Sequence, residues 1–140
     1  ATNPIYSLNA ARFLPEADQN SIEWLRQNAK LGESVVEATG NEWDANTGRV
    51  GAFSGVPTLL GWPGHVGMWG APGEEIGRRN ALINSFYGPP FSPEALSQLR
   101  PTYLFFGARE RAADPDLMAK ILARNPKWTQ IETQIVRVSP

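Results

Sequence analysis

Apolar residues recur at helical spacing in several segments of the chain, and each such segment predicts a helix. The first runs from about Asp18 to Leu31, because Ile22 and Leu25 share one face and Gly32 follows as a stop signal. A longer one covers Glu74–Tyr87, where an acidic first turn suits the helix N-terminus. Shorter helical segments are expected at 48–54, from Ser92 to before Pro101, and from Asp114 onward.

Runs of β-branched and aromatic residues predict strands between these helices. They are expected at 34–38, 57–60, 102–106, 128–133 and 134–138, with the last two antiparallel. Strands that alternate with helices indicate an α/β layered domain with a mostly parallel small sheet, helices on its faces and a C-terminal antiparallel hairpin. We expect residues 18–140 to form this single domain, preceded by an extended or irregular segment over residues 1–17.

The glycines are concentrated in one part of the chain. Nine of the 13 lie between Gly48 and Gly77, and five of these fall at intervals of three from Gly61 to Gly73. The run is too short and too poor in proline for a collagen-like helix. We therefore expect Gly61–Gly73 to be an extended or left-handed loop.

Composition narrows the possible chemistry. A chain of 140 residues suits one domain with a real core, and the absence of Cys together with a single His excludes thiolate and multi-histidine metal sites. A net charge of −1 offers no basic field for nucleic acid. No phosphate-binding glycine motif or nucleophile elbow is present, so we expect no cofactor, no metal and no catalytic constellation. No apolar run approaches the ~20 residues that span a bilayer, and the N-terminus lacks a signal-peptide pattern, so this chain is expected to be soluble.

Candidate binding residues follow the predicted parallel strands. The carboxyl ends of such strands meet at one edge of a sheet, where ligands usually bind. The loops after the three strands carry side chains that should converge on one rim: Glu37, Trp62, His65, Trp69, Arg109 and Glu110.

Each candidate also has a purely structural interpretation. Trp62 and Trp69 either stack on a sugar ring or fix the glycine loop to the body, and His65 is either an acid–base group or a structural hydrogen-bonding group. Glu37 binds a ligand hydroxyl, caps a loop amide or pairs with Arg49. The Arg109–Arg111 turn is either solvated or an anion site. Arg78 and Arg79 are expected to form surface ion pairs with Glu75.

An ordered series of motifs resembles one known family. In chain order it comprises Ser21–Leu25, Val35–Ala38 with Gly40, Gly48–Val50, Ser54–Trp62 with His65 and Trp69, Tyr87–Gly88, Tyr103, Gly107 and Glu110–Arg111. The series, which runs from about Leu8 to the end, resembles the C-terminal soluble part of the YYY-type polytopic membrane proteins of bacteria and archaea. Val66 and Gly70 depart from the charged residues that the resemblance leads us to expect there.

The resemblance implies a biological setting. Proteins of this type are distantly similar to C-type glycosyltransferases, which use lipid-linked sugar donors outside the cytoplasm and keep the catalytic acid in a loop of the membrane part. It implies that this domain lies on the extracytoplasmic side, is tethered to the membrane through the full-length protein, and contacts a lipid-linked sugar, a glycan or its own transmembrane region. Two alternatives remain open: a purely structural docking module, and a free-standing small hydrolase.

Overall fold

The computed structural model describes residues 13–41, 43–44 and 46–139, which form a mixed α/β domain. Its longest helices are α1 (Glu16–Asn28) and α4 (Gly73–Tyr87). The shorter helices are α2 (Arg49–Ser54), α3 (Pro63–Met68), the 3-10 helix η3 (Pro93–Gln98) and α5 (Leu117–Arg124). The strands are β1 (Val35–Val36), β2 (Tyr103–Phe105), β3 (Thr129–Glu132) and β4 (Ile135–Arg137).

The strands form one sheet in the order β1-β2-β4-β3. β1 and β2 are parallel, whereas β4 is antiparallel to both β2 and β3. The predicted fold class and the closing hairpin are thus confirmed. The parallel part is smaller than expected, because the segment predicted as a strand at 57–60 contributes a single parallel bridge between Thr58 and Val35.

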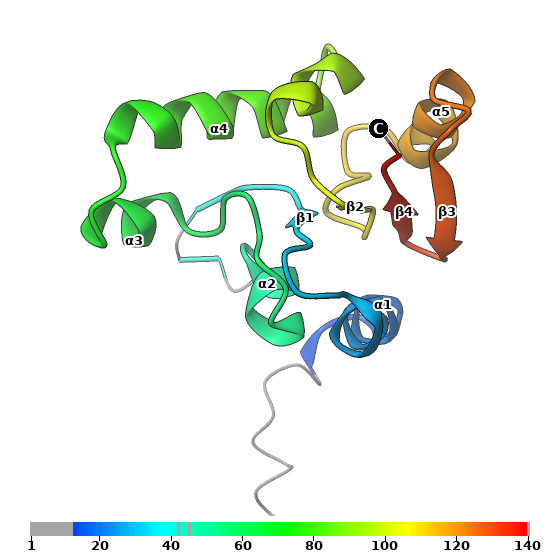
Figure 1. The fold of residues 1–140 in the computed structure, drawn as a ribbon, viewed down its shortest axis with the longest axis horizontal. Helices are drawn as coiled ribbons and strands as arrows, with labels where there is room; N and C mark the ends of the chain where they lie inside the picture. Colours follow the sequence, from blue (N-terminus) through cyan, green and yellow to red (C-terminus); the bar gives the residue numbers. More distant parts are fainter. Residues whose placement is uncertain (1–12, 42, 45, 140) are drawn as a thin grey trace, which may run out of the picture.

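Side chains that alternate along the strands build a hydrophobic core on each face of the sheet. Val36, Leu104 and Val136 pack with α4, η3 and α5, whereas Val35 and Phe105 pack with α1 and α2 on the other face. Figure 1 shows this layered arrangement, with α4 along one side of the sheet and α1 and α2 along the other. Burial on both faces explains why the segments of β1 and β2 are continuous apolar runs.

The first helix differs from its predicted bounds. It begins at Glu16, within the segment expected to be irregular, because the Pro15 carbonyl already accepts a hydrogen bond from the Gln19 amide. It ends at Asn28, since the next residue has an extended backbone with ψ 139°. Most of the expected N-terminal segment, residues 1–12, lies outside the described residues.

The middle of the glycine segment forms helix α3, so the expectation of an extended or left-handed loop was wrong for Pro63–Met68. Pro63 occupies the first turn of α3, where its missing N–H costs nothing, and the Val66 amide donates to the Trp62 carbonyl at 3.0 Å. Of the five evenly spaced glycines only Gly70 has a left-handed backbone (φ 96°), and it lies between α3 and α4. Closely spaced glycines indicate that the backbone can adopt several conformations, but they do not indicate which one it adopts.

Arg100, which follows η3, carries backbone strain that glycine would relieve. Arg100 has φ 50°, in the left-handed region, while its amide donates to the Leu96 carbonyl at 2.9 Å. We expect Arg100→Gly to raise the free energy of unfolding by about 1 kcal/mol in urea titrations, because only the side chain makes this conformation costly. Gly32→Ala is the matched control of opposite sign, since Gly32 has φ 88° and open space around its Cα. A loss of stability in Arg100→Gly would contradict the prediction.

Candidate functional site

The candidate residues expected on one rim divide between a buried charge cluster, a surface pocket and, for Arg109, a separate loop contact, so the single rim was a wrong expectation. Glu37, Arg49 and Glu110 are buried in the interior beneath α2. Trp62, His65 and Trp69 line a pocket on α3. The division arises because Glu37, directly after β1, and Glu110, in the turn after β2, are fully buried, whereas α3 projects outward from the domain.

The buried cluster is organised around the guanidinium of Arg49, the first residue of α2. Its Nε donates to Asp18 Oδ2 at 2.8 Å, and its two terminal nitrogens donate to the two carboxylate oxygens of Glu110 at 3.0 and 2.8 Å. This fork geometry is the strongest pairing that an arginine makes with a carboxylate. Gly107 permits the approach, because a Cβ there would lie 2.7 Å from both Arg49 and Asp18.

Glu37 completes the cluster as a third carboxylate. It accepts hydrogen bonds from the Val50 and Gly51 amides at 3.3 and 3.0 Å, and lies 3.7 Å from Arg49. Capping of an amide and pairing with Arg49, two of the structural interpretations of Glu37, therefore both occur. Burial, with the negative charge of Glu110, raises the pKa of Glu37 to about 7 against the opposing effects of the Gly51 amide and Arg49.

The charges of the cluster are paired with one another in the interior. Burial works to lower the pKa of Arg49, but the hydrogen bonds and charges of Glu110 and Asp18 outweigh it and raise that pKa. None of these four side chains lines either large pocket. The described residues also contain no group of three or more His, Cys, Asp or Glu side chains placed to hold a metal ion. The cluster therefore ties α1, α2 and two strand ends together.

Arg109 fastens the loop before α2 to the end of β2. It pairs with Asp44 and donates to the Thr39 carbonyl and the Thr47 hydroxyl at 3.3 and 3.2 Å. Gly40 makes room for it, since a Cβ at that position would lie 1.8 Å from the guanidinium. The expectation of a solvated turn at Arg109–Arg111 was thus wrong for Glu110, which is fully buried, and Arg109 already has an anionic partner within the protein.

The aromatic pocket lies between α3, the start of α4 and the segment after the Thr58 bridge. It has a volume of about 540 Å³. The ring centroids of Trp62 and His65 are 5.7 Å apart, and those of His65 and Trp69 are 6.1 Å apart. Trp62 is half-buried, whereas Trp69 is 77% exposed, so the rings run from the interior to the surface.

The carboxylate and the guanidinium that line the pocket are paired with each other. Within the described chain these are Glu75 and Arg79, at 2.7 Å. Hydrogen bonds from Arg78 and Arg79 lower the pKa of Glu75 to about 2, so this carboxylate stays ionised and paired. The expected ion pairs of Glu75 with both arginines are confirmed.

Two buried polar atoms belong to residues in the wall of the pocket. Thr58 Oγ1 and Trp62 Nε1 are buried and have no hydrogen-bond partner among the described residues. A buried donor or acceptor without a partner costs stability, so such atoms usually serve a bound molecule or water. The pocket thus offers aromatic surface, and the two neutral polar atoms lie in the protein behind that surface.

Sequence reasoning missed three of the residues that build these two sites. Asp18 lies 31 positions from Arg49 along the chain, and no local sequence pattern predicts their contact. Arg79 was expected only as a surface ion pair, but it also donates to the Leu59 carbonyl at 2.9 Å and joins α4 to the pocket wall. The third residue is Thr58, and its polarity within an apolar segment was the one feature of the sequence that could have indicated its place in the pocket wall.

No protein-family model matches the chain, and comparisons with curated proteins and with solved structures give no match. Within the described ranges, no helix has the length and apolar character needed to cross a membrane.

Proposed function

We propose that this chain is a glycan-contacting α/β domain of a polytopic membrane protein of the YYY type, on the extracytoplasmic side, and that the aromatic pocket on α3 is its contact surface. In this role the domain binds and positions a lipid-linked sugar or glycan and leaves the chemistry to the membrane part. The membrane context is supported by the ordered motif series, and the contact by the pocket.

The observation that carries the proposal is the row of three rings in a pocket whose carboxylate and guanidinium are paired with each other. Sugar rings present an apolar C–H face and a rim of neutral hydroxyls, so they suit exposed aromatic surface with adjacent polar groups. Trp69 supplies the accessible aromatic face. The paired Glu75 and Arg79 add no charge that would demand an ionic ligand.

The exposure of Met68 beside Trp69 favours a second candidate, a docking module. Both side chains are 77% exposed at the C-terminal end of α3, and adjacent exposed apolar residues often mark a protein contact. In this case the end of α3 packs on a membrane loop of the full-length protein and binds no sugar.

Replacing Trp69 tests sugar contact directly. We expect Trp69→Ala to weaken binding of an oligosaccharide or a polyprenyl-phosphate sugar at least fivefold in NMR titrations, because it removes the accessible ring and leaves the half-buried Trp62 in place. Trp43→Ala is the matched control, since Trp43 is 93% exposed and lies outside the pocket. Equal binding by both variants would contradict the proposal.

Met68→Ser separates the two candidates in the full-length protein. Met68 does not line the pocket, so a docking role predicts loss of assembly in this variant with sugar binding intact. A glycan-contacting role predicts normal assembly in Met68→Ser and impaired sugar binding in Trp69→Ala.

A further inference from the structure

The first turn of α2 lies between the buried charge cluster and the aromatic pocket, and it contacts both. Gly48 and Ala52 line the pocket. Gly48 faces the Trp62 indole, since a Cβ at position 48 would lie 3.4 Å from that ring. Gly51 packs against Thr58, whose Cγ2 would lie 3.0 Å from a Cβ at position 51. A small movement of this turn therefore reaches the side of the pocket wall that Trp62 and Thr58 form.

Glu37 holds the same turn from the interior. Gly48, the residue that precedes α2, has no side chain that could cap the helix. The carboxylate of Glu37 takes that role, because its Oε1 accepts from the Val50 amide at 3.3 Å and its Oε2 accepts from the Gly51 amide at 3.0 Å. These are the second and third amides of the helix, which an N-cap side chain ordinarily satisfies. The position of the turn thus depends on a side chain that directly follows β1.

The two hydrogen bonds need two acceptor oxygens, and the ionised carboxylate of Glu37 supplies both. Its negative charge also strengthens bonds from the amides at the start of a helix. A protonated carboxyl carries a hydroxyl group that donates, so one of the two amides then loses much of its hydrogen bond. Protonation of Glu37 therefore loosens the first turn of α2 at the point where it supports the Trp62 ring.

Glu37 changes its charge near neutral pH, because burial raises its pKa to about 7. The groups that face it are Arg49 of α2 with its partner Asp18 of α1, Glu110 in the turn after β2, and the buried Tyr87 of α4. Burial raises the pKa of Tyr87, so its hydroxyl stays neutral. Burial works against the charge of Arg49, but the ion pairs outweigh it and raise the pKa, so the guanidinium stays charged.

From these contacts we propose that Glu37 is a positioning residue for the aromatic pocket: its ionised carboxylate holds the first turn of α2, and this turn holds the Trp62 side of the pocket in the form that binds ligand. The effect on ligand affinity rests on the proposed function, whereas the effect on the Trp62 ring does not. By linkage, a ligand that needs the ionised form binds more tightly at about pH 8 than at about pH 6, and in turn favours ionisation of Glu37.

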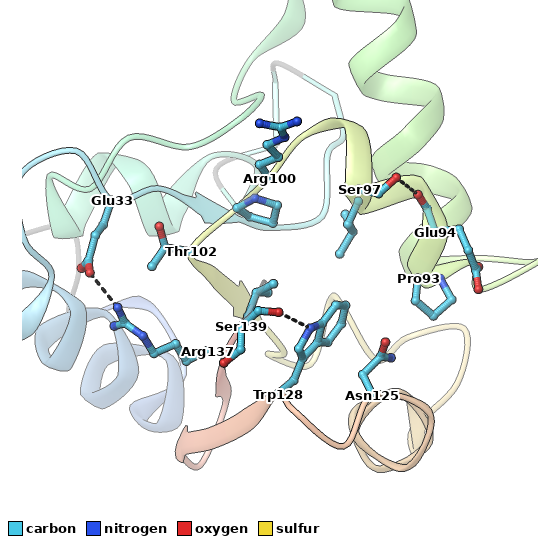
Figure 2. Close-up of a pocket in the computed structure, with 13 residues that line it drawn as sticks. Glu33, Pro93, Glu94, Ser97, Arg100, Thr102, Asn125, Trp128, Arg137 and Ser139 are labelled. Atoms are coloured by element: carbon cyan, nitrogen blue, oxygen red, sulfur yellow. Dashed lines mark hydrogen bonds and ion pairs between the residues drawn. The ribbon is translucent and has the colours of Figure 1, made fainter.

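The first test follows the Trp62 ring by NMR without any ligand. It uses His65→Gln as the background, which removes the titrating imidazole from the pocket. As the pH falls from about 8 to about 6, we expect the Trp62 indole Nε1–H signal to shift and the nuclear Overhauser effect between the Gly48 Hα protons and the ring to weaken. Trp69, after the exposed end of α3, and Trp128, in the separate pocket shown in Figure 2, are internal controls whose signals should stay in place.

Adding Glu37→Gln to this background should abolish both changes, because the amide keeps the shape of the carboxyl and has no charge to lose. Glu74→Gln is the matched control: it removes an exposed carboxylate next to Glu75 of the pocket lining and should leave the response of Trp62 intact. A Gly48–Trp62 contact that does not change with pH, or that changes equally in Glu37→Gln, would overturn the inference.

The second test measures the affinity for the neutral oligosaccharides maltotriose and chitotriose. In His65→Gln we expect at least threefold tighter binding at about pH 8 than at about pH 6, and in the double variant with Glu37→Gln the same weak binding at both. The comparison is between pH values, because His65 itself lines the pocket. Binding that is independent of pH in His65→Gln overturns the inference. Failure of both sugars to bind at any pH counts against the proposed function, and the Gly48–Trp62 contact then decides whether Glu37 positions the ring.

Discussion

Arg49→Met is expected to lower the free energy of unfolding by about 3–5 kcal/mol, because it removes the cation that compensates several buried carboxylates. Asp18, Glu37 and Glu110 are each 3% exposed or less, so water cannot take over the role of the guanidinium. Methionine fills much of the same volume, which makes the lost charge the main difference. Urea unfolding at neutral pH measures the effect.

Arg26→Met is the matched control for this loss. Arg26 pairs with Glu23 on the surface of α1, where the two side chains are 57% and 46% exposed. Exposed pairs contribute about 0–1 kcal/mol, so the control should remain close to the wild type. Arg49→Lys should give an intermediate loss, since it keeps the charge but not the fork to Glu110. A loss below 1 kcal/mol in Arg49→Met would show that the cluster does not hold the fold together.

The second large effect is a pH dependence that Glu37→Gln should remove. Burial first, and then the charge of Glu110, raises the pKa of Glu37 from 4.5 to about 7 in the folded protein. Below pH 4.5 the carboxyl is protonated in both the folded and unfolded states, and its contribution to stability is complete. As the pH rises towards 7, the unfolded chain releases a proton that the folded protein retains, so stability falls by on the order of 3 kcal/mol and then levels off.

Glu37→Gln resembles the protonated carboxyl at every pH. The variant should therefore match the wild type near pH 4.5 and be more stable above pH 7, and the difference between the two curves isolates this one group. Glu74→Gln, an exposed change at the start of α4, should follow the wild-type curve. Parallel curves for wild type and Glu37→Gln from pH 4.5 to 8 would refute the prediction.

Segments with strong local signals were predictable. The helix expected at Glu74–Tyr87 begins one residue earlier, at Gly73, and ends as predicted, because Gly88 and two prolines follow it. The apolar run around β2 fits a strand buried on both faces. Segments that depend on distant partners were not predictable: the residues at 57–60 form one bridge, since no further strand pairs along them.

In the candidate site, too, the contacts between residues distant in the sequence were not predictable. The sequence indicated that Glu37 and Arg49 could pair. Glu37 lies near the end of a predicted strand and Arg49 near the start of a predicted helix, at the same predicted edge of the sheet. It could not indicate that Glu110, 61 positions from Arg49, would take the guanidinium in a two-pronged contact. Nor could it separate the tryptophans from the carboxylates, because that separation depends on α3 forming a helix where glycine spacing favoured a loop.

Gly48 affects how mutations in this region are to be interpreted. Its backbone is left-handed (φ 72°), a Cβ there would lie 3.4 Å from the Trp62 indole, and the next residue is Arg49. A side chain at position 48 would therefore strain the first turn of α2, and its Cβ would contact the Trp62 ring in the pocket wall. A mutational scan will find this position intolerant in a stability assay and in a binding assay alike. A defect at position 48 is thus no sign of ligand contact, and the exposed Trp69 is the position that separates recognition from folding.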